Sequence, residues 1–126
     1  MSKLIFVVDD SNTVRASLKY TLEKNGYEVI AAEDGQDGLD KLEKLSQEKK
    51  RPSMIISDIN MPNLDGIGFI KKVKTKPQFK FIPILVLTTE SQQQKKMEGK
   101  DAGAAGWLVK PFKPEQLLGV VKKFVK

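Results

Sequence analysis

The sequence predicts an α/β fold, a doubly wound sheet of five parallel strands with helices on both faces. Short apolar runs alternate five times with segments whose apolar residues recur at helical spacing. The runs are rich in Val, Ile and Leu and lack polar alternation, as expected for strands that are buried on both faces. Because right-handed crossovers are nearly obligatory between such units, all five strands should point the same way.

The expected strands occupy residues 4–8, 27–32, 54–57, 82–88 and 106–109. Pro83 is tolerable because it stands at the beginning of its strand. Ser11 or Asp10 caps the first helix, which ends near Asn25-Gly26, the usual signals for a start and a stop. The second helix begins at Asp34-Gly35 and gives way to a polar loop over residues 46–52.

The remaining helices differ in how much they can bury. The third must end before Pro77, because a proline disfavours the α conformation for the residue that precedes it. The fourth, expected from Ser91 to Gly103, has little to bury beyond Met97 and two alanines, so its packing should be the weakest of the five. The last follows Pro114 and is expected to turn these apolar residues inward: Leu117, Leu118, Val121, Phe124 and Val125.

Composition limits the chemistry that is available. The 126 residues suit one domain, expected to span residues 1–126 with no output domain. There is no Cys and no His, which excludes disulfides, thiolate zinc sites, Ser-His-Asp triads and phosphohistidine formation within the chain. No apolar run is long enough for a signal peptide or a membrane span, so we expect a cytoplasmic protein without membrane insertion.

The net charge of +6 comes from 22 basic and 16 acidic residues. The lysines fall mostly on the expected helices, where an ordinary solvated surface explains them, and a basic patch for nucleic acid is the alternative. No recognition motif accompanies the charge. Nucleotide-binding motifs are missing too, because Gly66-Ile67-Gly68 lacks a third glycine and follows a loop instead of a strand.

Reactive residues follow four of the five strands. The strand ends carry Asp9 and Asp10, Asp58, Thr88 and Lys110. Parallel strands end at one edge of the sheet, where α/β proteins bind their ligands. Three carboxylates repel one another unless a cation lies among them, and a set of oxygen ligands favours Mg²⁺ or Mn²⁺. Asp58 could act as a nucleophile without a general base, since a carboxylate is already ionised near neutral pH.

Each of these residues also has an ordinary structural explanation. Asp9 or Asp10 could cap a helix, and Asp58 could form an Asx turn in the loop that follows it. Thr88 fits the β propensity of its strand. Lys110 could be a solvated lysine, but it ends an apolar strand before a proline. A cation directed at the acidic edge, able to bind phosphate, is therefore favoured.

Taken in order, these segments make the chain resemble a response-regulator receiver domain: the paired acids Asp9-Asp10, the stretch from Asp58 to Gly66, Thr88-Thr89-Glu90 and Lys110-Pro111-Phe112. The resemblance covers essentially the whole chain and is greatest to the stand-alone chemotaxis regulators. It implies a flavodoxin-like sheet with strand order 2-1-3-4-5. It also implies a two-component signalling protein, not an enzyme but a phosphoacceptor that catalyses its own phosphotransfer and autodephosphorylation.

The resemblance further implies how the site binds its ligands. Asp58 would take a phosphoryl group from a histidine kinase or a phosphotransfer protein. Mg²⁺, or Mn²⁺ in its place, would be bound by Asp9, Asp10, Asp58 and the main-chain carbonyl of Asn60. Positioning and charge neutralisation are the main requirements of such a transfer.

Other residues would hold the phosphoryl group or transmit its presence. By the resemblance, Thr88 and Lys110 bind the phosphoryl oxygens, with a cis peptide between Lys110 and Pro111. Asn60 and Glu90 match positions that tune dephosphorylation, and Trp107 stands where the family usually has Tyr or Phe as an aromatic switch. The expected protein is a monomer that signals through its fourth helix, fifth strand and fifth helix to a target protein such as the flagellar switch.

Three other functions remain open. The chain could serve a phosphorelay outside chemotaxis. It could be a Mg²⁺-dependent phosphohydrolase, although that class resembles D-x-D at the first strand end instead of the adjacent Asp9-Asp10 and usually needs a cap domain. It could also be a basic nucleic-acid-binding module, whose binding would depend on salt.

Overall fold

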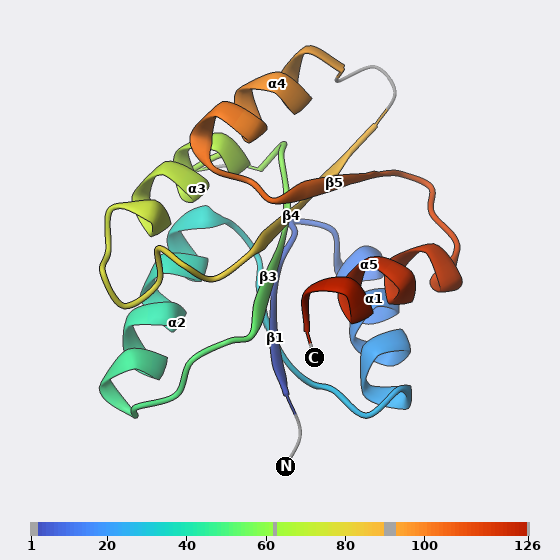
Figure 1. Cartoon of the computed structure of the whole chain (residues 1–126), viewed down its shortest axis with the longest axis horizontal. Helices are drawn as coiled ribbons and strands as arrows, with labels where there is room; N and C mark the ends of the chain where they lie inside the picture. The colour runs from blue at the N-terminus through green and yellow to red at the C-terminus, as the bar shows by residue number, and fades with distance from the viewer. Residues whose placement is uncertain (1–2, 62, 90–92, 126) are drawn as a thin grey trace.

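Five parallel strands form the central layer of the molecule (Figure 1). The computed structural model describes residues 3–61, 63–89 and 93–125, without the side chains of 93–96. The strands are β1 (Leu4–Val8), β2 (Glu28–Ala32), β3 (Met54–Asp58), β4 (Ile84–Thr88) and β5 (Gly106–Val109). They lie in the order β2-β1-β3-β4-β5, with parallel pairing throughout. The predicted doubly wound, flavodoxin-like fold is confirmed.

Helices cover both faces of this sheet. On one face lie α1 (Asn12–Lys24) and α5 (Pro114–Phe124), and on the other lie α2 (Gly35–Gln47), α3 (Gly66–Lys74) and α4 (Gln93–Ala102) (Figure 1). Alternation along β1 explains the two layers: Leu4, Phe6 and Val8 join the core beneath α2 and α3, whereas Ile5 and Val7 join the core beneath α1 and α5. None of the helices that the structure describes is long and apolar enough to cross a membrane.

Two side chains cap the N-termini of α1 and α2, and one of them, Ser11, was expected to do so. The Ser11 hydroxyl accepts the N–H of Val14 at 3.2 Å at the start of α1. The Asp34 carboxylate accepts the N–H of Asp37 at 2.8 Å at the start of α2. Each bond satisfies a backbone donor that has no partner inside the helix. Ser91, at which the fourth helix was expected to begin, lies outside the described residues.

Some boundaries differ from the expectation. β4 begins at Ile84 because Ile82 still belongs to the preceding turn, where its N–H donates to the carbonyl of Phe79 at 3.0 Å. In α5 and the residue after it, Leu117, Val121 and Val125 are buried. Leu118 and Phe124 are only half-buried, so the inward face is narrower than predicted.

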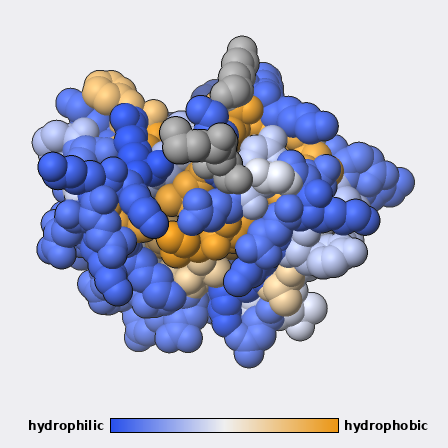
Figure 2. Space-filling model, turned by 90° about the horizontal axis from the view of Figure 1, so that it is seen from below, coloured by the Kyte–Doolittle hydropathy of each residue, from blue (hydrophilic) through white to orange (hydrophobic). Residues whose placement is uncertain are grey.

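Basic residues gather at the edge of the sheet where the strands begin. The helices run opposite to the strands, so their C-termini lie at this edge, and each described helix has a lysine in its last turn. Cations there complement the helix dipole. Viewed from this side, the surface is largely hydrophilic around a central apolar area (Figure 2). Favourable interactions with the helix dipoles therefore explain part of the positive charge at this edge, and a nucleic-acid ligand is not needed to explain it.

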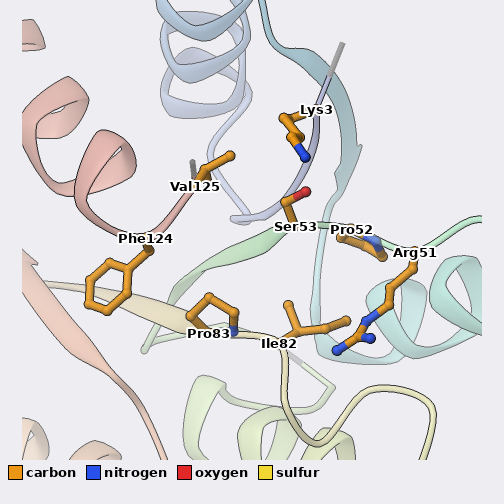
Figure 3. A pocket seen from close by; sticks show the side chains of 8 residues that line it. All are labelled: Lys3, Arg51, Pro52, Ser53, Ile82, Pro83, Phe124 and Val125. Carbon is orange, nitrogen blue, oxygen red and sulfur yellow. The ribbon is translucent and has the colours of Figure 1, made fainter. Parts of the chain in front are cut away.

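A shallow hollow of about 330 Å³ opens at the same edge (Figure 3). Its lining joins the starts of β1, β3 and β4 to the end of α5: Lys3, Arg51, Pro52, Ser53, Ile82, Pro83, Phe124 and Val125. It lies at the opposite end of the strands from the acidic residues singled out in the sequence.

The described part of the fourth helix, α4, has a glycine at its buried position. Within residues 97–102 of α4, only Gly99 is buried, and Met97 is 60% exposed. A Cβ at Gly99 would lie 3.6 Å from Val86 and 3.7 Å from Ile67, which is ordinary van der Waals contact. The described part of α4 thus packs through small residues, Gly99 and the partly buried Ala102. That its packing is the weakest of the five helices stays a prediction.

Gly99→Ala should stabilise the protein. The added methyl group fits the available space, and alanine in a helix interior is favoured over glycine by about 0.5–1 kcal/mol. Gly119→Ala in α5, where a Cβ meets nothing within 4 Å, is the matched control and should give a similar gain. Gly38→Ala should destabilise, because its Cβ would lie 2.9 Å from Phe69. Urea unfolding measures all three, and a loss of stability in Gly99→Ala would contradict the packing described for α4.

Candidate functional site

Three carboxylates lie together at the edge of the sheet where the strands end. Asp9 and Asp10 follow β1, and Asp58 ends β3, which pairs directly with β1. One carboxylate oxygen from each residue lies within 4.8 Å of the others. Asp9 and Asp58 are buried, whereas Asp10 is exposed. The pairing of the strands thus brings the predicted acids together.

Lys110 extends from the end of β5 to both buried acids. Its Nζ lies 3.2 Å from Asp9 Oδ2 and 3.4 Å from Asp58 Oδ1. Since β4 separates β5 from β3, the lysine side chain crosses the end of β4 to make these contacts. The peptide between Lys110 and Pro111 is cis, as the resemblance implied. The structure thus places the Lys110 ammonium at the acidic edge, in ion pairs with two of the predicted acids.

Asp58 is held by its own loop. Its Oδ1 accepts the N–H of Ile59 at 2.8 Å and that of Asn60 at 3.4 Å. The second contact has the spacing of an Asx turn, so the structural explanation offered for this residue holds beside the chemical one. Asn60 itself is exposed, two residues beyond Asp58 in the same loop.

Burial and the neighbouring charge of Asp9 raise the pKa of the Asp58 carboxyl. The Lys110 ammonium and the N–H groups of Asn60 and Ile59 act in the opposite direction but do not cancel this effect. The ionised form of Asp58 is therefore less favoured in the protein than in an exposed aspartate. A divalent cation among the three carboxylates would offset the repulsion, and their oxygen atoms are the ligands that Mg²⁺ and Mn²⁺ prefer.

The loop after β3 presses against the strand end. A Cβ at Gly66 would lie 2.3 Å from the carbonyl oxygen of Asp58 and 2.6 Å from Ile59 Cα, so only glycine fits there. The Gly66 N–H donates to the Ile59 carbonyl at 2.9 Å and closes the loop. Asp65 then caps α3 by accepting the N–H of Gly68 at 2.8 Å. The loop is consequently held close to the acidic cluster.

Thr88 contributes a buried hydroxyl at the end of β4. It ends β4, immediately after Leu87, which pairs with Asp58. Its Oγ1 is buried and has no hydrogen-bond partner among the described residues. A buried polar group left unpaired costs roughly 1–3 kcal/mol. An anion bound between Asp58 and Lys110 would give this hydroxyl an acceptor.

The family profile of the response regulator receiver domain matches residues 5–122. The chain belongs to this family. It is the receiver domain of a two-component response regulator, and receiver domains are phosphoacceptors that bind Mg²⁺ in an acidic pocket. The acidic cluster of this receiver domain has the oxygen ligands that such an ion requires.

Relatives of this receiver domain include both short and long proteins. Chemotaxis protein CheY4 of Vibrio cholerae shares 46% identity and a TM-score of 0.88 over 99% of this chain and 100% of that structure. Chemotaxis protein CheY1 of Helicobacter pylori is 40% identical over 90% of this chain and 89% of its own length. The alkaline phosphatase synthesis regulator PhoP of Bacillus subtilis is 36% identical over the whole chain but only 50% of its own length. The receiver domain thus spans about half the length of several curated relatives.

Trp107 and Glu90 were expected to act in switching and in tuning dephosphorylation. Trp107 is in β5, opposite Val86 of β4, and is 41% exposed, so it is not a core aromatic. Glu90 lies outside the described residues.

Sequence analysis missed Arg15. Its guanidinium donates to the main-chain carbonyl of Asp9 and to the side chain of Asn12. It therefore fastens the first turn of α1 to the strand end that carries Asp9. A signal was present: a cation near a helix N-terminus is unfavourable with the helix dipole and calls for a partner.

Asp58→Asn should stabilise the metal-free receiver domain at neutral pH. The folded protein has the raised pKa, so it binds more protons than the unfolded chain between the two pKa values, and stability falls as pH rises through that window. Asp58→Asn removes the titrating carboxyl group, so the variant should not show this fall in stability. The gain should be present at pH 7 and disappear as pH falls below the unfolded pKa of an aspartate.

Urea unfolding in EDTA across this pH range measures the effect. Asp101→Asn, which changes an exposed acid on α4, is the control and should alter stability by no more than about 0.5 kcal/mol. A pH-independent difference between wild type and Asp58→Asn would contradict the assigned cause.

Proposed function

We propose that this chain is a response-regulator receiver domain, residues 1–126, in which Asp58 is the phosphoacceptor. The observation that carries the proposal is the position of Lys110, whose Nζ lies within 3.4 Å of Asp58 and 3.2 Å of Asp9. A lysine beside a nucleophilic carboxylate attracts a phosphoryl donor and neutralises the charge on the transferred group. The Thr88 hydroxyl, which has no hydrogen-bond partner in the part of the chain that the structure describes, adds a donor for the same group.

The acidic cluster is the proposed metal site. Asp9, Asp10, Asp58 and the main-chain carbonyl of Asn60 hold Mg²⁺, or Mn²⁺ in its place. When bound, the ion supplies positive charge to the carboxylates and to the phosphoryl oxygens. Its presence also favours the ionised form of Asp58, which burial and Asp9 otherwise disfavour.

The transfer needs few groups from the protein. A carboxylate oxygen of Asp58 attacks phosphorus, and a P–O bond forms as the P–N bond to the phosphohistidine of a partner kinase or phosphotransfer protein breaks. The electron pair of that bond leaves with the imidazole nitrogen. Oδ1 already accepts two N–H groups and contacts Lys110, which favours Oδ2 as the attacking atom.

The phosphoryl group is held and later released at the same place. Lys110 Nζ and Thr88 Oγ1 donate to its oxygens, so the lysine exchanges its contacts with the acids for contacts with the phosphoryl group. Attack by water on phosphorus returns the Asp58 carboxylate and inorganic phosphate. Asn60 and Glu90 set the rate of this step.

The signal leaves through α4, β5 and α5. Lys110 follows β5 directly, and the described part of α4 packs against the core through the small residues Gly99 and Ala102. A movement of Lys110 toward the phosphoryl group therefore acts on the segment that carries Trp107, which serves as the aromatic switch. The proposed protein is a cytoplasmic monomer that binds its target by this surface.

Chemotaxis is the proposed pathway, with the flagellar switch as target. Similarity to chemotaxis proteins CheY4 and CheY1 over nearly the full length of both supports it. The second candidate function is that of a receiver domain in another phosphorelay. It is supported by the similarity of this chain to PhoP, of which the matched region is half.

The protein should acquire one phosphoryl group when it is mixed with Mg²⁺ and acetyl phosphate, as measured by intact mass. Asp58→Asn should acquire none, because the nucleophile is lost, and EDTA should prevent the reaction of the wild type. Asp101→Asn, an exposed acid on α4, should react like the wild type. An adduct on Asp58→Asn, or none on the wild type, sinks the assignment, and repeated turnover of phosphate esters would favour a phosphohydrolase instead.

The chemotaxis proposal has its own test. Cells that lack the gene should keep their flagella but lose directed spreading in soft agar. The wild-type gene should restore spreading, and a gene encoding Asp58→Asn should not. Normal spreading without the gene would favour the other phosphorelay.

A further inference from the structure

Asp34 is a third buried carboxylate among the described residues, and it lies outside the acidic cluster. It follows β2 and is only 7% exposed. Both of its oxygens are used. Oδ1 accepts the N–H of Asp37 at 2.8 Å and caps α2, and Oδ2 accepts the side-chain amide N–H of Asn63 at 2.8 Å.

The second bond joins distant parts of the chain. Asn63 belongs to the loop after β3, three residues beyond Asn60, and lies 29 residues from Asp34 in sequence. Its φ of 67° is in the left-handed region, which asparagine tolerates better than most residues. The same two N–H donors lower the pKa of Asp34, so the carboxylate accepts both bonds in its ionised form.

The main chain makes a contact beside this bond. A Cβ at Gly35 would lie 2.4 Å from the carbonyl oxygen of Leu64, so the start of α2 touches the loop backbone directly. Only glycine permits this approach. Adjacent residues, 34 and 35 on one side and 63 and 64 on the other, therefore fasten the loop to α2.

The other end of this connection is the strand end that carries Asp9. The Asp9 N–H donates to the carbonyl of Ala32 at 3.1 Å, two residues before Asp34. The loop after β2 thus links the backbone of Asp9 to the loop that contains Asn60. Those are the two sides of the proposed metal site.

We infer that Asp34 is a positioning residue for the metal site: through Asn63 it holds the loop after β3 so that the Asn60 carbonyl faces the acids. The inference rests on the proposed function of that site. Residues that orient metal ligands without touching the metal typically change affinity 10–100-fold when they are removed.

Two variants separate this role from helix capping. Asp34→Ser keeps a hydroxyl that can cap α2 but cannot also bind Asn63. Asn63→Gly keeps the left-handed backbone and the α2 cap but removes the amide. Each should weaken Mg²⁺ binding about tenfold in calorimetric titration. The double variant should lose no more than either single variant, because both break the same bond.

Asn25→Gly is the matched control. It removes an asparagine amide that donates to the Thr21 carbonyl at 2.8 Å at the opposite edge of the sheet, and it should bind Mg²⁺ like the wild type. Unfolding midpoints are recorded for every variant. Unchanged Mg²⁺ affinity in both single variants, with or without lower stability, would overturn the positioning role alone. Absence of Mg²⁺ binding by the wild type would overturn the metal site and the positioning role together.

Discussion

Two like charges, Asp9 and Asp58, are buried side by side where β1 and β3 end, and one lysine contacts both. This constraint follows from the parallel pairing of the two strands, which leaves neither carboxylate free to move away. Burial and, after it, the charge of Asp9 raise the pKa of Asp58, and Lys110 offsets only part of this effect. A bound cation, or protonation of one of the two acids, would therefore stabilise the site.

The same constraint connects the site to the rest of the fold. Lys110 is shared between the two acids, so any ligand that takes it from them acts on the end of β5. On the face of the sheet that carries α2 and α3, the described part of α4 packs against the core through small residues, with Gly99 buried and Ala102 partly buried. The proposed change of surface would use a helix packed in this way beside a rigid sheet edge.

The sequence predicts the parts of the site that are placed by the ends of strands. Apolar runs locate Asp9, Asp58, Thr88 and Lys110, and parallel pairing then brings them to one edge. The sequence does not predict the contacts of Arg15, or the bond between Asp34 and Asn63. Asp34 was recognised only as the start of a helix, because a bond between loops 29 residues apart has no periodic signal. The half-buried positions of Leu118 and Phe124 depend on tertiary packing and escaped prediction for the same reason.

A crystal structure with Mg²⁺ and beryllofluoride, a phosphoryl mimic, tests the central claim most directly. The account predicts beryllium on a carboxylate oxygen of Asp58, with fluorine atoms contacting Lys110 Nζ and Thr88 Oγ1. The metal should be bound by Asp9, Asp10, Asp58 and the Asn60 carbonyl. Beryllofluoride on another carboxylate, or a Thr88 hydroxyl still without a partner, would contradict the account.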